Sequence, residues 1–431
     1  MKKMLATAVA IGLIGMTGQA VAITDNEANA SLPFSFTNPG ARAMGMGGAF
    51  LGLSDDASAA YTNPAGLTQL VSPEIALEIR SVDTNTRWLD GGNVQYNPFN
   101  SSGLNYSSQN DDTTSLRSFS FVYPGERMSF AVYRYEIVNY ETDFQSAGAT
   151  WTTGDDSGQF GDIFAYDVNG NLEIEVYGAA MGFKVNDQFS LGLGINYYYL
   201  DISATTDRFF PNGDPGVREA SLNGDGGWGF NLGARWAATD WMSVGLSWRY
   251  APDLNYDSLL TAPYAPGESF LTETDMNVPD VFGIGFSFRP SDAWIINFDV
   301  NRVFYSQITD DLNSAFESDQ VTELDPLKLK DGTEIHLGTE YTFATKYPFS
   351  IRVGAWHDPA HEMVYRGTPA PTDFNTTLLP PVNAATFSAG RGSQTHYTFG
   401  AGMAFSNFQI DLGADFSDTS DMLSLSGVYR F

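Results

Sequence analysis

Few side chains in this sequence suit bond-making chemistry, since it has four histidines and no cysteine. His357 and His361 lie four residues apart with Glu362 beside the second, a set of types that can ligate a metal. Their order is not the His-Glu-x-x-His of zinc proteases and prolines interrupt the segment, so we interpret them as solvated loop residues. We interpret His336 and His396 as structural. With no Gly-x-Ser-x-Gly elbow or nucleotide fingerprint either, we predict no enzyme, no metal and no cofactor.

Two arginines suit a different chemistry, the binding of an anion. Arg249 and Arg352 lie on the polar faces of segments whose other face is apolar. A guanidinium that is shielded from water can pair with the carboxylate of a fatty acid. The alternative is that such arginines pair with acids of the chain itself, such as Asp55 and Asp56.

The elements that would position these side chains are strands, because apolar residues recur with a period of two from residue 75 to the end. In the clearest run, odd-numbered residues 189–199 are apolar or aromatic, and the residues between them are mostly small or polar. That pattern is typical of a strand between lipid and a polar lumen. About fourteen such runs predict an all-β protein, an antiparallel transmembrane β-barrel with an even number of strands.

The connections alternate in length. Short turns near residues 125, 186, 239, 291, 345 and 407 alternate with long polar loops near 82–115, 138–171, 203–225, 253–277, 306–331 and 358–393. This is the arrangement of outer-membrane barrels, and it puts the short turns in the periplasm. The loop 253–277 is unusually apolar for a loop facing water, and either captures a ligand or packs on itself over the barrel mouth. Its candidate binding residues are Leu259, Leu260, Tyr264 and Phe270.

The two ends and the charge fit an exported protein. Residues 1–22 have a basic start, an apolar core and the small-x-small sequence Ala20-Val21-Ala22, which predicts a signal peptide. The formal net charge of −29 argues against nucleic acid as a partner, because phosphate contacts need surplus Lys and Arg. The apolar and aromatic C-terminal strand, residues 423–431, looks like the strand by which the barrel-assembly machinery recognises its clients.

Residues 23–72 are unlike the rest of the chain, since they are rich in glycine and alanine and have no regular period. Such a stretch suits close backbone packing inside something larger. We therefore predict three parts: a signal peptide at 1–22, a hatch or plug at 23–72, and the barrel at 73–431.

The sequence of residues 40–49, followed by Asp55-Asp56 and by Asn63-Pro64-Ala65-Gly66, resembles the N-terminal hatch of the FadL-type outer-membrane transporters of hydrophobic compounds. A similar string opens PorV-like proteins, which are components of a secretion apparatus. The resemblance implies that Asn63, Pro64, Ala65 and Gly66, together with Asp55 and Asp56, form the gating part of a hatch. It also implies that hydrophobic ligands pass through the barrel.

The third run breaks its period, since Met128, Phe130 and Val132 are even-numbered whereas Tyr133 and Tyr135 are odd-numbered. An inserted residue near Val132 and Tyr133 would produce this pattern as a β-bulge. In FadL-type proteins the third strand is kinked and opens the wall, so the resemblance implies a lateral exit here, with Phe130 beside the ligand. The alternative is that Met128, Phe130 and Val132 face an apolar part of the lumen.

Together these features predict a monomeric channel in the outer membrane of a Gram-negative bacterium, in contact with lipid and lipopolysaccharide. It would take up long-chain fatty acids or aromatic and aliphatic hydrocarbons passively. The alternative is a PorV-like structural or secretion component that binds a protein partner.

Overall fold

The computed structural model describes residues 34–95, 100–152, 159–163, 165–263, 267, 269–309, 329–361 and 392–431. The predicted signal peptide and Tyr264 lie outside these residues. Among the described residues, no helix is both long and apolar enough to cross a membrane.

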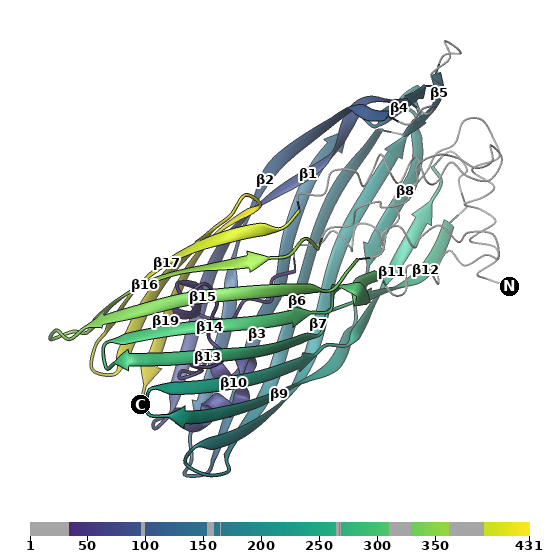
Figure 1. Ribbon diagram of the computed structural model, residues 1–431. Helices are drawn as coiled ribbons and strands as arrows, with labels where there is room; N and C mark the ends of the chain where they lie inside the picture. The colour runs from purple at the N-terminus through teal and green to yellow at the C-terminus, as the bar shows by residue number, and fades with distance from the viewer. Residues whose placement is uncertain are drawn as a thin grey trace.

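Within the described chain, fourteen antiparallel strands pair in a closed ring, as Figure 1 shows. In the order of the ring they are β1 (Glu74–Gln95), β2 (Asn100–Tyr123), β3 (Met128–Ser146), β6 (Ala165–Lys184), β7 (Phe189–Phe209), β9 (Gly226–Thr239), β10 (Met242–Tyr250), β13 (Val281–Ser291), β14 (Trp294–Val303), β15 (Gly332–Phe343), β16 (Phe349–Asp358), β17 (Gln394–Ala404), β18 (Phe408–Phe416) and β19 (Ser420–Arg430). Closure by β1 and β19 leaves no open edge, as a sheet in lipid requires. The predicted fold class and strand number are confirmed.

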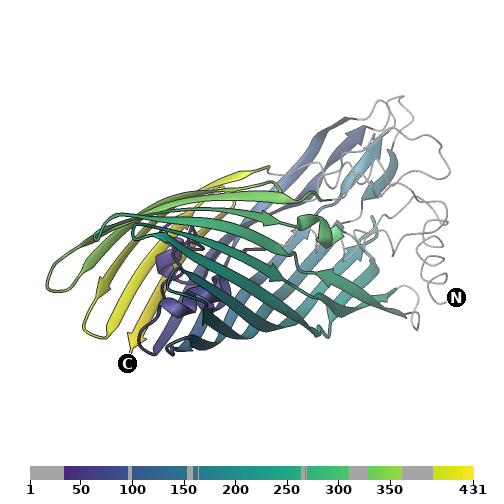
Figure 2. The same ribbon diagram turned by 60° about the horizontal axis from the view of Figure 1, so that its bottom comes forward.

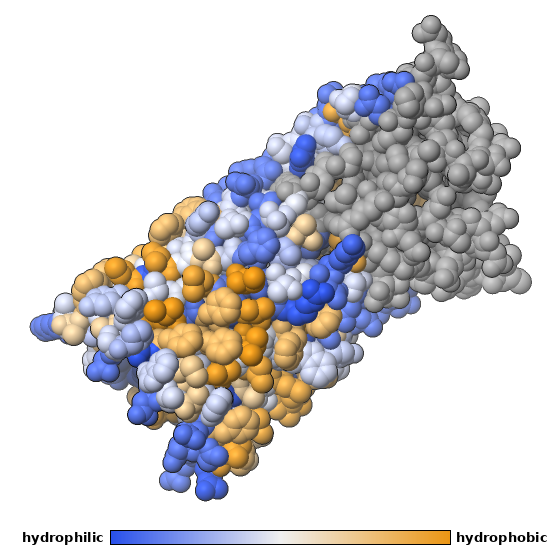
Figure 3. All heavy atoms as spheres, in the orientation of Figure 1, coloured by the Kyte–Doolittle hydropathy of each residue, from blue (hydrophilic) through white to orange (hydrophobic). Residues whose placement is uncertain are grey.

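The two faces of the wall differ as the period-two pattern predicts. Leu191, Leu193 and Ile195 on β7 are exposed on the outside, whereas Ser190 and Asn196, on either side of this run, are buried inside. Figure 3 shows the exposed apolar side chains as a band over the end of the barrel with the short turns, with hydrophilic residues on both sides of it. An apolar band of this kind faces the hydrocarbon of a bilayer.

Five further strands extend the opposite end of the barrel, where the sequence predicted only loops. They are β4 (Ala149–Thr152), β5 (Gln159–Ile163), β8 (Pro215–Leu222), β11 (Asp253–Thr261) and β12 (Ser269–Asn277). β11 pairs with both β12 and β8, so the apolar stretch 253–277 is largely an ordered hairpin that continues the wall.

Residues 34–73, called the inner segment below, lie inside the barrel near its short-turn end, as Figures 1 and 2 show. The segment contains two single-turn helices, α3 (Ala41–Met44) and α4 (Ala59–Thr62), and the 3-10 helix η1 (Pro64–Gln69). A second 3-10 helix, η2 (Tyr305–Thr309), follows β14. Ala41, Met46, Phe50, Ala57 and Leu67 are at most 2% exposed, so the wall covers the inner segment closely.

Candidate functional site: the lumen and the inner segment

Glycines line the wall where it meets the inner segment. A Cβ atom added to any of them would lie 2.0–3.0 Å from an atom of residues 41–65. They are Gly182 on β6, Gly192 on β7, Gly233 on β9, Gly245 on β10, Gly285 on β13, Gly338 on β15, Gly354 on β16, Gly400 on β17 and Gly413 on β18. Only glycine permits so close an approach of two backbones. Among the described residues this glycine collar covers the arc from β6 to β18 except for β14, and it is missing on β19, β1, β2 and β3.

Hydrogen bonds hold the inner segment on the same arc. The backbone N–H groups of Phe50 and Leu51 donate to Asp299 Oδ2 at 2.6 and 2.8 Å. Gly47 N–H donates to Thr398 Oγ1 at 2.8 Å, and its carbonyl oxygen lies 2.7 Å from His336 Nδ1. His336 is therefore structural, as predicted, because its ring fixes the backbone of the inner segment.

The predicted hatch residues Asn63 to Gly66 lie at a turn of the inner segment. Asn63 is 0% exposed, and its Nδ2 donates to Leu51 O at 3.1 Å and to Ala234 O of the wall at 3.2 Å. Its Oδ1 caps η1 by accepting from Ala65 N–H, and Pro64 occupies the first turn of η1. Gly66 leaves no room for a side chain, because a Cβ would lie 2.3 Å from Ser54 O. Asn63 thus joins two parts of the inner segment to β9.

Arg42 of the inner segment joins several carboxylates. Its Nε and Nη2 donate to the two oxygens of Glu340 on β15, each at 3.0 Å, and its Nη1 donates to Asp55 at 2.6 Å. Asp55 also pairs with Arg289 at 3.2 Å. Asp56 accepts from the N–H and hydroxyl of Ser58, and burial raises the pKa of its carboxyl although Arg42 opposes this. The two acids therefore anchor the inner segment internally and to the wall.

Arg352 belongs to this ion network, so the interpretation of it as a ligand-binding residue is wrong. Its guanidinium is 1% exposed and pairs with Glu340 at 2.5 Å and with Asp411 at 2.8 Å. The alternative that the sequence left open, pairing with acids of the chain, holds for this arginine. The partner acids lie on β15, which is next to β16, and on β18, two strands away.

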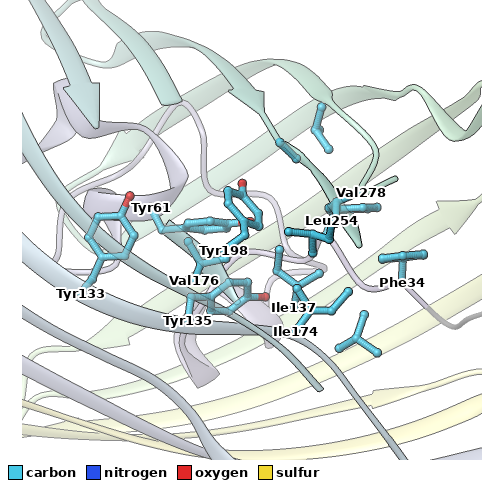
Figure 4. Close-up of a cluster of buried hydrophobic side chains, with 14 of the residues drawn as sticks. Phe34, Tyr61, Tyr133, Tyr135, Ile137, Ile174, Val176, Tyr198, Leu254 and Val278 are labelled. Carbon is cyan, nitrogen blue, oxygen red and sulfur yellow. The ribbon is translucent and has the colours of Figure 1, made fainter. Parts of the chain in front are cut away.

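Above the inner segment the lumen is apolar and aromatic on one side, as Figure 4 shows for Tyr61, Tyr135, Val176 and Tyr198. The residues of this lumenal cluster are buried; most come from β3, β6, β7, β11 and the inner segment, and others from β2, β12, β13, β14 and η2. Phe34 and Phe36 enter it from the N-terminal side with their rings stacked, 5.9 Å between centroids.

Arg249 lies at the base of the lumenal cluster. It is 5% exposed, its guanidinium carbon lies 5.1 Å from the centre of the Tyr61 ring, and its Nη2 donates to Phe36 O at 3.3 Å. No described carboxylate lies within ion-pair distance of it, and its Nη1 has no hydrogen-bond partner among the described residues. A buried cation without an anion is costly, so this position suits an anionic ligand.

The hairpin of β11 and β12 extends the apolar lining outward. Leu260 and Phe270 are register partners on the face that carries the buried Leu254 and Tyr256. Leu259 lies opposite Leu271 on the other face, where Leu271 is exposed. Of the three described capture residues, Leu260 and Phe270 therefore face the lumen and Leu259 does not.

Strand β3 has a bulge, but not at Val132 and Tyr133 as predicted. Alternation is unbroken from Met128 to Tyr135, and the register with β6 shifts between Glu136 and Val138. Phe130 is 52% exposed on the outer face, so it lines neither a ligand site nor an apolar part of the lumen. Tyr133 and Tyr135 point into the lumen, and their aromatic character made them look like a continuation of the outer face.

The backbone ladder between β2 and β3 is short. It joins Ser118–Tyr123 to Phe130–Tyr135 and then stops, while β2 goes on pairing with β1 and β3 with β6. We call the unpaired stretch above Ser118 and Tyr135 the seam. A cavity of about 30 Å³ lies just below it, between the inner segment and β1–β3. Its lining includes Ala57 and Tyr61 inside and Leu77, Phe119 and Arg134 of the outer face.

The remaining histidines do not form a metal site among the described residues. His357 is exposed, whereas His361 pairs with Asp358 at 3.2 Å and stacks on Tyr305. Glu362 lies outside the described residues. His396 is buried and its Nδ1 lies 2.8 Å from Asp415, consistent with a structural role.

A closed antiparallel barrel with an apolar outer band and a segment packed inside it defines a plugged barrel of the outer-membrane type. A family description, outer membrane protein transport protein (OMPP1/FadL/TodX), matches residues 20–419. The chain belongs to this family of outer-membrane transport proteins, and the predicted resemblance is confirmed.

Solved structures agree on the fold. A FadL homologue from Pseudomonas aeruginosa is 16% identical, with a TM-score of 0.61 over 93% of this chain and 99% of that one. The toluene transporters TbuX of Ralstonia pickettii and TodX of Pseudomonas putida are each 15% identical, with TM-scores of 0.55 and 0.56, over 92% of this chain and 99% of theirs. A comparison with curated proteins gave no match.

Proposed function

We propose that this protein is a passive channel for hydrophobic small molecules in the outer membrane of a Gram-negative bacterium, and that its preferred ligands carry a carboxylate, as long-chain fatty acids do. The structural relatives include toluene transporters, and the FadL-type resemblance of the sequence implies fatty acids, so both acids and aromatic hydrocarbons are ligand classes to distinguish. The single observation that favours the acids is the unpaired Arg249 at the base of the lumenal cluster.

The other buried arginines of the described chain differ from Arg249, because each of them has a carboxylate as partner. Arg80, Arg117, Arg208 and Arg352 each pair with a glutamate at 2.5–3.4 Å. Arg249 has no ion-pair partner among the described residues: it contacts a backbone carbonyl and the Tyr61 ring, and the carboxylate of Glu334 attracts it only from a longer distance. A hydrocarbon would leave this cation without a direct anionic partner, whereas a carboxylate would pair with it and place its tail among the aromatic residues.

The inner segment occupies this site in the structure. Phe36 presents a carbonyl oxygen to Arg249 and its ring to the lumenal cluster, as an acid with an apolar tail would. An incoming ligand therefore competes with residues 34–36, and it moves them only if it binds the displaced arrangement better. Asn63 to Gly66 would hold the rest of the hatch in place while this end moves.

The hairpin at the outer rim and the wall beside β1–β3 suggest where the ligand enters the barrel and where it leaves. Leu260 and Phe270 would receive the ligand at the outer rim. The glycine collar packs the hatch tightly from β6 to β18, whereas beside β1–β3 a cavity remains and hydrogen bonds with Glu78, Arg80 and Tyr135 hold the hatch, so the passage would open there by breaking these bonds. The cavity there and the seam above it support a lateral exit into the bilayer. Movement is driven by the concentration gradient alone.

The test compares oleate with oleyl alcohol, which has the same tail and no charge. We expect gene-dependent uptake of oleate by cells and acyl chains in organic extracts of the purified protein. Arg249→Gln should weaken oleate binding about tenfold or more, because hydrogen bonds to charged groups contribute ~1.5–3 kcal/mol each, and should leave binding of oleyl alcohol unchanged. Equal losses for both ligands would refute carboxylate recognition, and toluene uptake without oleate uptake would favour the hydrocarbon class.

A further inference from the structure

Side chains rather than backbone close the seam between β2 and β3. Ser115 Oγ of β2 donates to Glu136 Oε1 of β3 at 2.6 Å. Arg117 of β2 pairs with the same oxygen at 3.4 Å and donates from Nη2 to Ile137 O at 3.1 Å. Further up, Gln109 Nε2 donates to Asp143 O at 2.8 Å. The seam can thus open by breaking side-chain contacts, without breaking a β ladder.

Glu136 stands between two arginines. Arg117, on the lumenal side, contacts its Oε1, and Arg134, on the outer side, contacts its Oε2 at 3.3 Å. Both Glu136 and Arg117 are nearly completely buried, at 1% and 4% exposure. Arg134 is also held by Glu173 and Glu175 of β6. A carboxylate of the chain therefore occupies the middle of the wall with a cation on each side.

The lumenal arginine is linked to Arg249 by aromatic rings. Arg249 lies over Tyr61 at 5.1 Å, the rings of Tyr61 and Tyr135 are 4.5 Å apart, and Arg117 lies over Tyr135 at 5.3 Å. Cations and rings alternate, so the path from the base of the lumenal cluster to the seam is lined by surfaces that accept both a tail and an anionic head.

Arg117 shares a property with Arg249. The Nε–H of Arg117 and the Nη1 of Arg249 are buried and have no hydrogen-bond partner among the described residues. The same is true of one nitrogen each of Arg134, Arg235 and Arg352, but of these arginines only Arg117 and Arg249 lie over the rings of Tyr135 and Tyr61. Buried donors are normally satisfied, and a guanidinium has donors in a fork that matches a carboxylate. Each arginine therefore retains a donor for an anion that the chain does not supply.

We propose that Arg117 is a second binding station for the ligand's carboxylate, in the wall itself, and that Glu136 is its internal stand-in. A ligand leaving the lumen moves its head group from Arg249 to Arg117 and displaces Glu136 from it. The displaced Glu136 keeps Arg134 and Ser115 as partners. Arg134 acts as a positioning residue for Glu136. The inference rests on the proposed function, because it assumes an acid as ligand and a lateral exit.

The experiment measures initial uptake of labelled oleate and oleyl alcohol by cells that express each variant. Arg117→Gln should lower oleate uptake about tenfold and leave oleyl alcohol uptake unchanged, and Arg117→Lys, which keeps the charge but loses the fork of donors and the stacking on Tyr135, should restore only part of it. Gln109→Ala is the matched control, because it removes an uncharged seam contact and should affect both ligands alike. Resistance of the folded barrel to detergent at room temperature checks assembly of each variant.

A second measurement uses the purified protein. Glu136→Gln removes the competing carboxylate and should tighten oleate binding about tenfold, with no change for oleyl alcohol. Unchanged or weaker oleate binding would overturn the inference. An Arg117→Gln variant that loses both ligands by the same factor, or neither, would overturn it as well. Both results differ from failure of the proposed function, in which the wild-type protein itself neither binds nor takes up oleate.

Discussion

Gly338→Ala tests whether the glycine collar holds the inner segment in place. The added Cβ would lie 2.0 Å from Met46 O and 2.5 and 2.6 Å from two further backbone atoms of Met46, where real contacts stay above 3.0 Å. Both partners are backbone, one in β15 and one in the inner segment, so neither can rotate away. The inner segment must move by at least about 1 Å.

The magnitude follows from what this movement breaks. Overpacking costs ~2 kcal/mol. The two hydrogen bonds of the next residue, Gly47, to Thr398 and His336 would also stretch, at ~1 kcal/mol each. Docking of the inner segment is then weaker by about 4 kcal/mol, which corresponds to roughly a 10³-fold rise in the population of its released form.

The absence of cysteine from the chain supplies a clean assay. Ala57 is 0% exposed and borders the cavity, so Ala57→Cys adds a sulfur where there is room. A large maleimide cannot reach this thiol until the inner segment is released. In this background Gly338→Ala should speed labelling about 10³-fold, up to the rate of a fully exposed thiol.

Gly427→Ala is the control, because its nearest neighbour would be a Phe408 ring atom at 3.6 Å, an ordinary contact. It should label at the parent rate. If both alanine variants label alike while their barrels remain folded, the close contact of the two backbones does not fix the inner segment, and the reasoning from the glycine collar is wrong.

Three further predictions concern the inner segment and the outer rim. Asn63→Ala removes contacts to Leu51 and Ala234, so the same thiol assay should show about tenfold or faster labelling with an intact barrel, and parent-like labelling would exclude an anchoring role. Arg42→Gln leaves Glu340 with Arg352 alone and should weaken docking by ~3 kcal/mol, whereas Arg302→Gln, at an exposed pair, should have no effect on labelling. Burial lowers the pKa of His361 but Asp358 outweighs it and raises the pKa to about 9, so the pair is fully formed below about pH 6.5 and is lost as the pH rises through 9. NMR of the four histidines, with His361→Gln for assignment, should show this titration, and a midpoint near 6.5 would contradict it.

The strands of the wall could be predicted from sequence because lipid imposes one rule on every residue that faces it. An outward position must be apolar, so the runs of β7 or β19 are visible without knowledge of any contact. The extensions β4, β5, β8, β11 and β12 stand above the apolar band, where both faces can be polar, and the same rule no longer marks them.

The lumen could be predicted less well, because the role of each lumenal residue depends on contacts with residues that are far away in the sequence. Arg249 and Arg352 look alike in sequence, yet Asp411 and Glu340 compensate only the second. The bulge was misplaced because Tyr133 and Tyr135 are lumenal aromatics. Arg117 and Glu136 were missed, although a charged residue that breaks the period of two at the end of a run was a visible signal.

The position of the inner segment has a consequence for how the molecule is built. It is synthesised first, yet its contacts join residues 191, 249, 298 and 351 positions apart. The collar that receives it is complete only when β18 has been added, and a backbone packed so closely that the wall has no room for a Cβ atom cannot be threaded into a finished ring. β1 and β19, the first and last strands of the ring, must therefore pair around a segment that is already inside. We expect this pairing to be the slowest folding step, because it joins residues that are far apart in the sequence.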